Sequence, residues 1–529
     1  MAARLWQVRM EALALLSKLA SETFVGVGGL DEAFGLRGQG LVRAPGLAQA
    51  DGAFEFRYER LAAGLSIHVR LAAQHAGLRL LDKDLHFRLE RFRRCSPAEQ
   101  HFDVTHPRRQ LDVQLDFLGK RLPHHLSVAA RHVDLEAEFT GEGNPEHASR
   151  DAADQFFPRL EHPRTPRPFV TGMPAFDAFP MALWAQMSAR YWRSPRAEIM
   201  SYPEATGLPE LREAIARHLG ANRGLLCQPQ EVFIFAGAQD AFLQIAQILL
   251  EPGDPVWMEN PGAIGARNAL LSRGVRLVPV PVDGEGIDVA KGREAEPAFR
   301  AAFVTPAHQH PLGVPMSRDR RFELLAEAER ADAWIIEDDY VGEFHYGRAS
   351  LPPLKALDTS GRVIYVGTFS KALFPAIRLG YAVVPPALVD MFERILGAAA
   401  HGVSHSVQAM VAGFIDEGKF SAHIRRMRSL YRDRRDALME AAEDRLSGLL
   451  DVQWTETGFH TVGLLPPGQS DRRASQAAAQ ENLAAAPLSR FALDPIPVQG
   501  LTLGFSATPP AEIARGVDRL AHALRSAPR

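Results

Sequence analysis

Short apolar runs alternate with helical stretches from about residue 230 onward, and this alternation restricts the fold more than any other feature of the chain. The expected strands are residues 232–235, 256–258, 275–282, 302–304, 334–336, 363–366 and 381–384. Helical patterns lie between several of them, for example at residues 242–250 and 321–330. Such an alternation predicts an α/β fold with a large, doubly wound, mostly parallel sheet. Sheets of this kind bind their ligands beyond the carboxyl ends of the strands.

The length of the chain indicates more than one domain, because 529 residues are too many for a single compact core. A proline-rich stretch at residues 162–168 predicts a linker, since proline favours extended backbone and cannot continue a helix. We expect an unassigned N-terminal region at residues 1–160, a linker at 161–170, a large sheet domain at 171–400 and a smaller C-terminal α/β subdomain at 401–529.

Composition and charge exclude several classes of protein. The chain is 46% hydrophobic and 23% charged, which is usual for a globular protein. A net charge of -3 gives no global reason to bind nucleic acid or an anionic membrane. The two cysteines, Cys95 and Cys227, do not make a disulfide framework and fit a reducing compartment. No apolar run reaches membrane-spanning length, so we expect a soluble cytoplasmic protein.

Lys371 directly follows an expected strand, in the segment Thr368-Phe369-Ser370-Lys371. Burial at this place lowers the pKa of a lysine and makes its amine a usable nucleophile. The hydroxyls of Thr368 and Ser370 and the guanidinium of Arg378 are suited to bind a phosphate beside it. The alternative is a surface loop that happens to contain serine and lysine.

Two further segments carry chemistry at strand ends. Glu337-Asp338-Asp339-Tyr340 follows an apolar strand, and an aspartate there can pair with a protonated pyridine nitrogen. A solvated turn or a metal site is the alternative, although His345 is the one histidine close enough to assist a metal. Gly237-Ala238-Gln239 lies between a strand and a helix, where backbone N–H groups form an anion site.

Together and in this order, these segments resemble the fold-type I enzymes that depend on pyridoxal 5'-phosphate (PLP). The similarity is greatest to the MocR type, the aminotransferase-like regulators of the GntR family. The motifs that carry it include Gly172-Met173-Pro174, Tyr202-Pro203, Gly207-Leu208-Pro209, Thr305-Pro306-Ala307, Glu337-Asp338-Asp339-Tyr340, Gly367-Thr368-Phe369-Ser370-Lys371 and Leu503-Gly504-Phe505-Ser506. The resemblance implies a PLP domain that reacts with an amine or amino acid and assembles as a homodimer.

The resemblance also implies a role for each site residue. Lys371 forms the covalent aldimine with PLP, and Asp338 pairs with its pyridine nitrogen. Tyr340 reaches the phenolic oxygen of the ring, as does Gln309. Tyr202 reaches the phosphate bound by the neighbouring subunit. The phosphate is held within the subunit by Ala238, Gln239, Thr368, Ser370 and Arg378. No metal is implied.

Two positions depart from the family pattern. The turn Asn260-Pro261-Gly262-Ala263 has alanine where the family usually has a tyrosine stacked on the ring. Near the C-terminus, Thr502 stands where α-amino-acid transaminases have the arginine that binds the substrate carboxylate. A threonine supplies no charge, so we expect weak transamination of common α-amino acids. Amines without an α-carboxylate, or an effector that does not turn over, are favoured instead.

The N-terminal region is the third departure, because MocR regulators begin with a winged helix-turn-helix that residues 1–160 do not display. It is either a divergent domain or the translation of a faulty gene model. A basic stretch, Arg88, Arg91, Arg93 and Arg94, is interpreted as a solvated helix face. His124 and His125 lack metal-ligand spacing and are interpreted as surface residues.

Three functions follow from these observations. The first is a PLP-dependent aminotransferase that acts on an amino compound. The alternative is a MocR-type transcriptional regulator that senses an amine or amino-acid effector and binds DNA. Decarboxylase or lyase chemistry on the same fold is the third.

Overall fold

The structure is a computed structural model. It describes strands within the first 142 residues and then residues 156–158, 163, 165–193, 200–347, 351–399 and 402–526. The chain divides into two compact units, residues 1–142 and 143–529, each described here by itself. The domain boundaries expected at residues 160, 170 and 400 stay predictions. Within the described residues, no helix combines the length and apolarity needed to cross a membrane.

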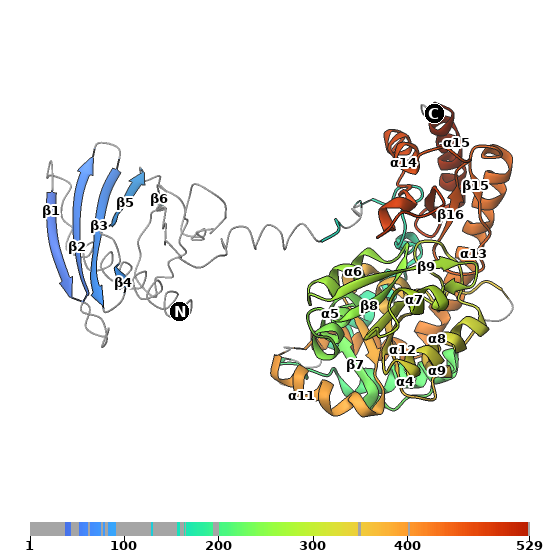
Figure 1. Ribbon diagram of the computed structural model, residues 1–529, viewed down its shortest axis with the longest axis horizontal. Helices are drawn as coiled ribbons and strands as arrows, with labels where there is room; N and C mark the ends of the chain where they lie inside the picture. Colours follow the sequence, from blue (N-terminus) through green and yellow to red (C-terminus); the bar gives the residue numbers. More distant parts are fainter. Residues whose placement is uncertain are drawn as a thin grey trace. The chain divides into compact units, whose positions relative to one another are not determined.

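The N-terminal unit contains a six-stranded sheet in which every pairing is antiparallel (Figure 1). Its strands are β1 (Arg37–Arg43), β2 (Gly52–Leu61), β3 (Gly64–His75), β4 (Leu78–Arg79), β5 (Lys83–Glu90) and β6 (Val128–Ala130). The order is β1-β2-β3-β5-β6, and β4 pairs with β3.

The helix expected around Arg88 is wrong, because Arg88 lies in strand β5. The reason is visible in the sequence, where Leu85, Phe87 and Leu89 alternate with polar residues at the period of a strand. The other basic and histidine positions singled out in this region, and the question of a winged helix, lie outside the described residues.

The second unit is built on an eight-stranded sheet of order β10-β9-β8-β11-β12-β13-β14-β7. Its strands are β7 (Val232–Phe235), β8 (Pro255–Asn260), β9 (Arg276–Asp283), β10 (Gly286–Ile287), β11 (Ala301–Val304), β12 (Trp334–Asp338), β13 (Val363–Thr368) and β14 (Gly380–Val383). Every expected strand is confirmed. Strands β9, β8, β11, β12 and β13 are parallel, whereas β14 runs antiparallel to both of its neighbours.

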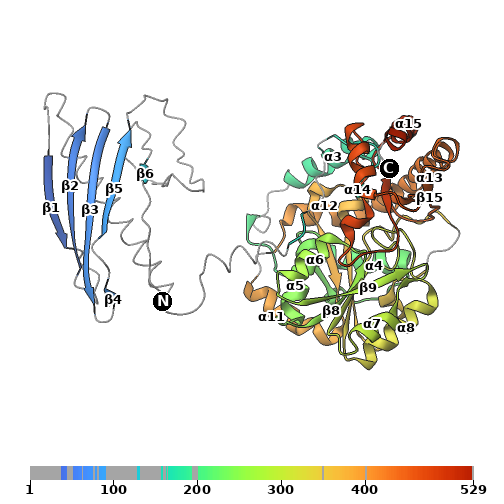
Figure 2. The same cartoon turned by 45° about the horizontal axis from the view of Figure 1, so that its top comes forward.

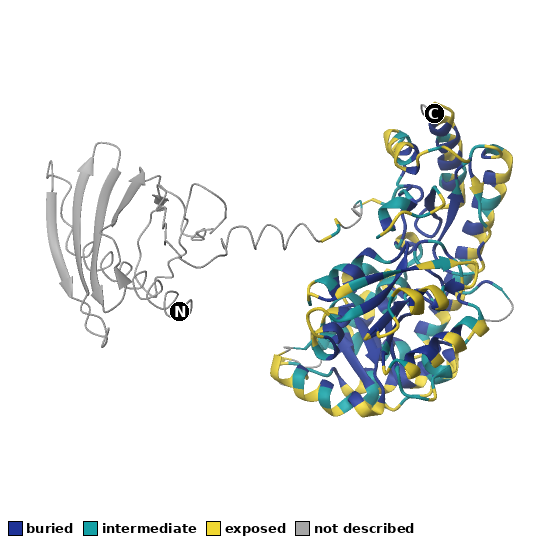
Figure 3. Cartoon of the chain, viewed as in Figure 1, coloured by how far each residue is buried: buried dark blue, intermediate teal, exposed yellow. Residues whose placement is uncertain are grey.

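Helices cover both faces of this sheet (Figure 2). The helices of this part of the chain are α3 (Met181–Trp192), α4 (Pro209–Arg223), α5 (Ala238–Leu249), α6 (Ile264–Leu271), α7 (Val289–Ala295), α8 (Arg318–Arg330), α9 (Leu354–Leu357), α10 (Phe369–Ala372), α11 (Val389–Ala399) and α12 (His405–Asp416). Alternate residues of a strand serve opposite faces: Val256 and Met258 of β8 pack with α5 and α6, and Trp257 packs with α7 and α8. The strands are therefore buried on both sides, as Figure 3 shows.

The C-terminal part carries a three-stranded antiparallel sheet, β15 (Asp451–Val452), β16 (His460–Leu464) and β17 (Gly500–Gly504). Helices α13 (Lys419–Arg445), α14 (Asp471–Gln480) and α15 (Pro510–Ser526) belong to it. The segment that enters the unit is built into this part, because Phe169 forms a β-bridge with Gly504. A Cβ at position 504 would lie 2.0 Å from the Val170 carbonyl oxygen, so only glycine fits there.

Candidate active site at the carboxyl edge of the sheet

The residues expected to carry the chemistry meet where β12 and β13 end. Asp338 is the last residue of β12 and pairs in register with Val366 of β13. Lys371 lies in the short helix α10, which begins directly after β13. Neighbouring parallel strands thus bring together two residues that are 33 positions apart (371 − 338 = 33) in the sequence.

The amine of Lys371 is held by the segment that enters the unit. Its Nζ donates a hydrogen bond to the Gly172 carbonyl oxygen at 2.5 Å. Gly172 has a φ of 73°, and a Cβ there would lie 3.0 Å from Nζ, so glycine is needed for the backbone conformation and for space. Burial lowers the pKa of Lys371 to about 8, and the nearby Asp338 opposes part of that effect. A desolvated amine of this kind is what the chemistry expected at Lys371 requires.

Asp338 is buried, and its Oδ1 has no hydrogen-bond partner in the described part of the chain. Burial raises the pKa of this carboxyl group to about 8; the neighbouring charge of Asp339 adds to the rise, and Lys371 opposes it. A buried polar atom without a partner is costly, and native proteins seldom leave one. The Oδ1 atom is therefore suited to accept a hydrogen bond from a bound group.

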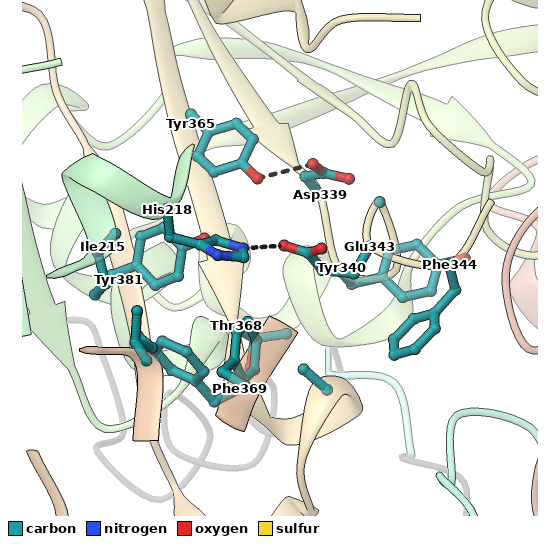
Figure 4. A pocket seen from close by; sticks show the side chains of 14 residues that line it. Ile215, His218, Asp339, Tyr340, Glu343, Phe344, Tyr365, Thr368, Phe369 and Tyr381 are labelled. Carbon is teal, nitrogen blue, oxygen red and sulfur yellow. Dashed lines mark hydrogen bonds and ion pairs between the residues drawn. The ribbon is translucent and has the colours of Figure 1, made fainter. Parts of the chain in front are cut away.

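Asp339 points to the other side of the strand, into a small pocket lined by residues of several elements (Figure 4). Its Oδ2 accepts hydrogen bonds from Arg223 Nη2 at 2.6 Å and from the Tyr365 hydroxyl at 2.7 Å. In the same pocket, His218 Nε2 lies 2.6 Å from Glu343 Oε1. No sequence pattern joins Arg223 to Asp339, since 116 residues separate them.

A second cluster, at the N-terminus of α5, is suited to an anion. Gly237, with a φ of 92°, is the N-cap and has no side chain to occupy the first N–H groups of the helix, which belong to Ala238 and Gln239. Arg378 lies beside it, because a Cβ at position 237 would be 3.4 Å from the guanidinium carbon. The exposed Arg378 side chain donates to the Ala236 carbonyl at 2.7 Å. Among the described residues, no carboxylate forms an ion pair with it.

The remaining residues expected at the site differ in how they are placed. Thr368 caps α10 by accepting a hydrogen bond from the Ser370 N–H at 3.2 Å, so both lie in the lysine loop. The Tyr340 hydroxyl donates to the His308 carbonyl at 3.0 Å. Tyr202 is 90% exposed, as a residue that serves a neighbouring subunit needs to be.

Gln309 is engaged within its own loop. Its Nε2 donates to Glu259 Oε2 at 3.1 Å and to the Pro261 carbonyl at 2.8 Å, and its Oε1 accepts from the Leu312 N–H at 3.0 Å. These bonds use both ends of the amide. We infer that Gln309 shapes the loop beside the site, and its contact with a ring oxygen stays a prediction.

Three histidines near Lys371 were not recognised in the sequence as part of the site. His308 and His310 each pack edge to face against His460, with ring centroids 4.7 Å apart for His308 and His460 and 5.3 Å apart for His310 and His460. Burial lowers the pKa of all three, to about 4 for His460, and the charge of Lys371 lowers those of His310 and His460 further. The cluster is thus neutral at pH 7. His460 lies in β16, whereas His308 and His310 lie in a loop much earlier in the chain. The sequence therefore carries no pattern that joins the three histidines.

These observations fit PLP. The free Oδ1 of Asp338 matches a protonated ring nitrogen, Lys371 supplies a desolvated amine, and the helix terminus with Arg378 matches a phosphate. The arrangement and the sheet order define a fold-type I domain of the PLP-dependent transferases.

Comparison with known proteins gives the family. Residues 172–520 match the aminotransferase class I and II family, and the chain belongs to that family. A similar relative is the probable rhizopine catabolism regulatory protein MocR of Rhizobium meliloti, 40% identical over 67% of this chain and 72% of the relative. The 2-aminoadipate transaminase of Thermus thermophilus is 30% identical over 68% of this chain and 89% of the enzyme.

Solved structures agree with this assignment. The α-aminoadipate aminotransferase LysN of Thermus thermophilus, complexed with N-(5'-phosphopyridoxyl)-L-leucine, matches with a TM-score of 0.62 and 29% identity over 68% of this chain and 91% of that chain. The similarity of this chain thus extends both to regulators and to aminotransferases. Family and structural neighbours alike imply PLP as the cofactor.

Proposed function

We propose that the domain binds PLP through Lys371 and reacts with the amine of a small amino compound, as an aminotransferase does. The observation that carries the proposal is the buried, unpartnered Oδ1 of Asp338 on the same side of the sheet as the Lys371 amine. When bound, PLP supplies an electron sink for charge that develops at the carbon next to the ligand's amine.

Each cluster of the chain has a separate task in this proposal. Asp338 holds a proton on the ring nitrogen through a charge-assisted hydrogen bond. The first N–H groups of α5, with Arg378 and the hydroxyls of Thr368 and Ser370, hold the phosphate. Tyr340 orients the ring from its phenolic side. Tyr202 completes the phosphate site of a second subunit, so the working unit is a homodimer.

Lys371 also moves a proton. With a pKa near 8, its Nζ exists in both protonation states around neutral pH, as an acid–base catalyst requires. In this role Nζ would take a proton from one atom of a bound ligand and return it to another. The neutral His308, His310 and His460 beside it add no competing positive charge.

A second candidate function is transcriptional regulation, in which the same domain senses an amino compound. The 40% identity to a regulatory protein favours it, as do Ala263 and Thr502, which replace residues typical of efficient transaminases. In that case the amine ligand binds at Lys371 without rapid turnover, and another part of the protein binds DNA.

One experiment tests both functions. The purified protein with PLP is mixed with a panel of amino donors, and the absorbance of the lysine-bound cofactor is followed over time. Full conversion to the amine form of the cofactor indicates an aminotransferase. A stable spectral change without conversion, together with a gel shift of DNA upstream of the gene, indicates a regulator. Failure to bind PLP at Lys371 would overturn both.

A further inference from the structure

Glu259 is a buried carboxylate near the carboxyl end of β8, and among the described residues no lysine, arginine or histidine pairs with it. Its two oxygens accept three hydrogen bonds instead. Oε1 accepts from the Thr305 N–H at 3.1 Å, and Oε2 accepts from the Thr305 hydroxyl at 2.7 Å and from Gln309 Nε2 at 3.1 Å. A buried carboxylate without a cation is costly, so these three donors carry its stabilisation.

The three donors belong to the loop that follows β11. Glu259 fixes the first residue of this loop, Thr305, whose hydroxyl oxygen in turn accepts from the His310 N–H at 3.0 Å. Gln309 closes the loop, since its N–H donates to the Val314 carbonyl at 2.9 Å. Glu259 is therefore the common acceptor around which the loop is folded.

One side of this loop meets the candidate site through Tyr340. The His308 carbonyl accepts a hydrogen bond from the Tyr340 hydroxyl at 3.0 Å. The His310 ring packs edge to face against the Tyr340 ring, with ring centroids 5.9 Å apart. Tyr340 and His310 are both part-exposed, whereas His308 is buried. The loop thus presents two rings to open space and keeps its own backbone inside the protein.

The other side of the loop holds the turn that follows β8. Gln309 Nε2, one of the donors to Glu259, also donates to the Pro261 carbonyl at 2.8 Å. The turn continues to Ala263, the N-cap of α6, at the position where the family usually has a tyrosine stacked on the ring. Glu259 therefore joins the loop and the turn into one wall of the candidate site.

We propose that Glu259 is a positioning residue for PLP, because it holds in place the wall that orients the cofactor ring. The inference rests on the proposed function and deepens it. Alanine at position 263 cannot stack on a ring, so the orientation of the ring depends more on the rest of the wall. Glu259 is not itself a contact of the cofactor and acts through Thr305 and Gln309.

An amide of the same shape is unable to take over this task. All three hydrogen bonds come from donors, so each needs an acceptor oxygen on residue 259. Glutamine offers one oxygen and one NH2 group. Glu259→Gln therefore sets the new NH2 group against either the Thr305 N–H or Gln309 Nε2 and leaves a buried polar group unsatisfied. The volume of the side chain is kept, so the variant changes the hydrogen bonds and not the packing.

Glu337 provides the matched control, because it is also a buried carboxylate near the carboxyl end of a central strand, β12. It accepts two backbone hydrogen bonds, from the Leu354 N–H at 2.8 Å and from the Lys355 N–H at 2.9 Å. Both donors belong to α9. Glu337→Gln therefore makes the same chemical change away from the loop and the turn.

The test compares full-length wild-type protein, Glu259→Gln and Glu337→Gln, each with and without PLP. In cofactor-free protein, Glu259→Gln is expected to speed the amide hydrogen exchange of residues 305–314, and Glu337→Gln is not. With PLP, Glu259→Gln keeps covalent attachment at Lys371 but weakens the visible circular dichroism of the bound cofactor, which reports how the ring is oriented. PLP affinity is expected to fall about tenfold, or about 1.4 kcal/mol.

Two further variants trace the path of the effect. Gln309→Leu and Glu259→Gln remove the same contact, so the double variant is expected to lose less PLP affinity than the product of the two single losses. Thr305→Val removes one donor to Glu259 and replaces Glu259→Gln where that variant does not fold. It is expected to weaken the dichroism, whereas Thr305→Ser, which keeps the hydroxyl, is expected to leave it unchanged.

The outcomes separate this inference from the proposed function. Wild-type dichroism and PLP affinity in Glu259→Gln, with or without faster exchange of residues 305–314, overturn the role of Glu259 and leave the proposed function standing. Equal losses in Glu259→Gln and Glu337→Gln overturn it as well, since any buried carboxylate would then have the same effect. If wild-type protein does not bind PLP at Lys371, the proposed function fails, and the inference about Glu259 fails with it.

Discussion

Two adjacent carboxylates at the end of β12 have opposite surroundings. Asp339 is paired with a buried arginine and a tyrosine hydroxyl, at 2.6 and 2.7 Å. Asp338 faces Lys371 and keeps one oxygen without a partner in the described residues. Consecutive residues of a strand point to opposite faces, which is why one sequence step separates the two environments. We infer that the carboxylate with complete pairing holds the fold and the incompletely paired one serves the ligand.

The largest effect is expected on the Asp338 side, from Lys371→Ala. The variant loses covalent attachment of PLP completely, because no other amine lies beside Asp338 in the described site. Borohydride reduction followed by mass spectrometry of the peptides measures the attachment. Lys355→Ala is the matched control, since Lys355 is also buried and donates to a backbone carbonyl, that of Val363, at 2.9 Å. Labelling of a different lysine in the wild type would contradict the assignment.

On the other side, Asp339→Asn is expected to cost about 3–5 kcal/mol of the free energy of unfolding, because it leaves the Arg223 charge buried without its partner. Burial lowers the pKa of Arg223, but the charges of Asp339, Tyr365 and Glu343 and the hydrogen bond to Asp339 together outweigh it and raise that pKa. Urea denaturation of the cofactor-free protein measures the loss. A variant as stable as the wild type would show that the Asp339 pair does not hold the fold.

Asp338→Asn is expected to act on the cofactor. Loss of a charge-assisted bond of about 1.5–3 kcal/mol weakens PLP affinity by roughly one to two orders of magnitude. Equilibrium titration with PLP gives the affinity, and Asp339→Asn, measured wherever it stays folded, is the comparison. If the Asp339 variant loses more PLP affinity, the two carboxylates have been assigned the wrong way round.

The smallest effect is that of a single pH unit, which changes the free energy of unfolding by at most about 1.4 kcal/mol for one titrating group. Asp338 has a folded-state pKa raised to about 8, so the folded protein binds a proton that the unfolded chain has released, and stability falls as pH rises from about 4 to 8. Lys371, lowered to about 8, reverses the trend above that value, where the unfolded chain holds the extra proton. Asp338→Asn makes this fall shallower in cofactor-free protein, while Glu259 and Glu337, whose pKa values burial raises to about 7, keep their own contributions to it. Parallel curves for variant and wild type would refute this assignment.

Much of the fold was predictable because buried parallel strands and the helices between them leave strong apolar patterns. The antiparallel course of β14 was not, since an apolar run such as residues 381–384 carries no direction. Strand β5 was also missed, although Leu85, Phe87 and Leu89 carry its alternation. The sequence therefore defined the sheet of the second unit better than that of the first.

The residues of the candidate site also fall into two groups, those that the sequence predicts and those that only the folded structure brings to the site. Residues in local motifs, such as Asp338 and Lys371, could be found because the strand, the turn that follows it and the reactive side chain are adjacent in the sequence. Arg223 and His460 could not, because their roles arise from packing between distant segments. An arginine near a helix end is ordinary in any sequence. Only the folded chain shows that Arg223, the last residue of α4, is buried against Asp339.

The bond between Lys371 and Gly172 has a further consequence. An amine that is bonded to another group cannot also donate fully to the Gly172 carbonyl, which it contacts at 2.5 Å when free. Three residues before Gly172, the same segment is tied to the C-terminal sheet by the bridge between Phe169 and Gly504. Each change in what Lys371 binds therefore adds or removes one hydrogen-bond donor at the carbonyl of Gly172, in the segment that enters the unit.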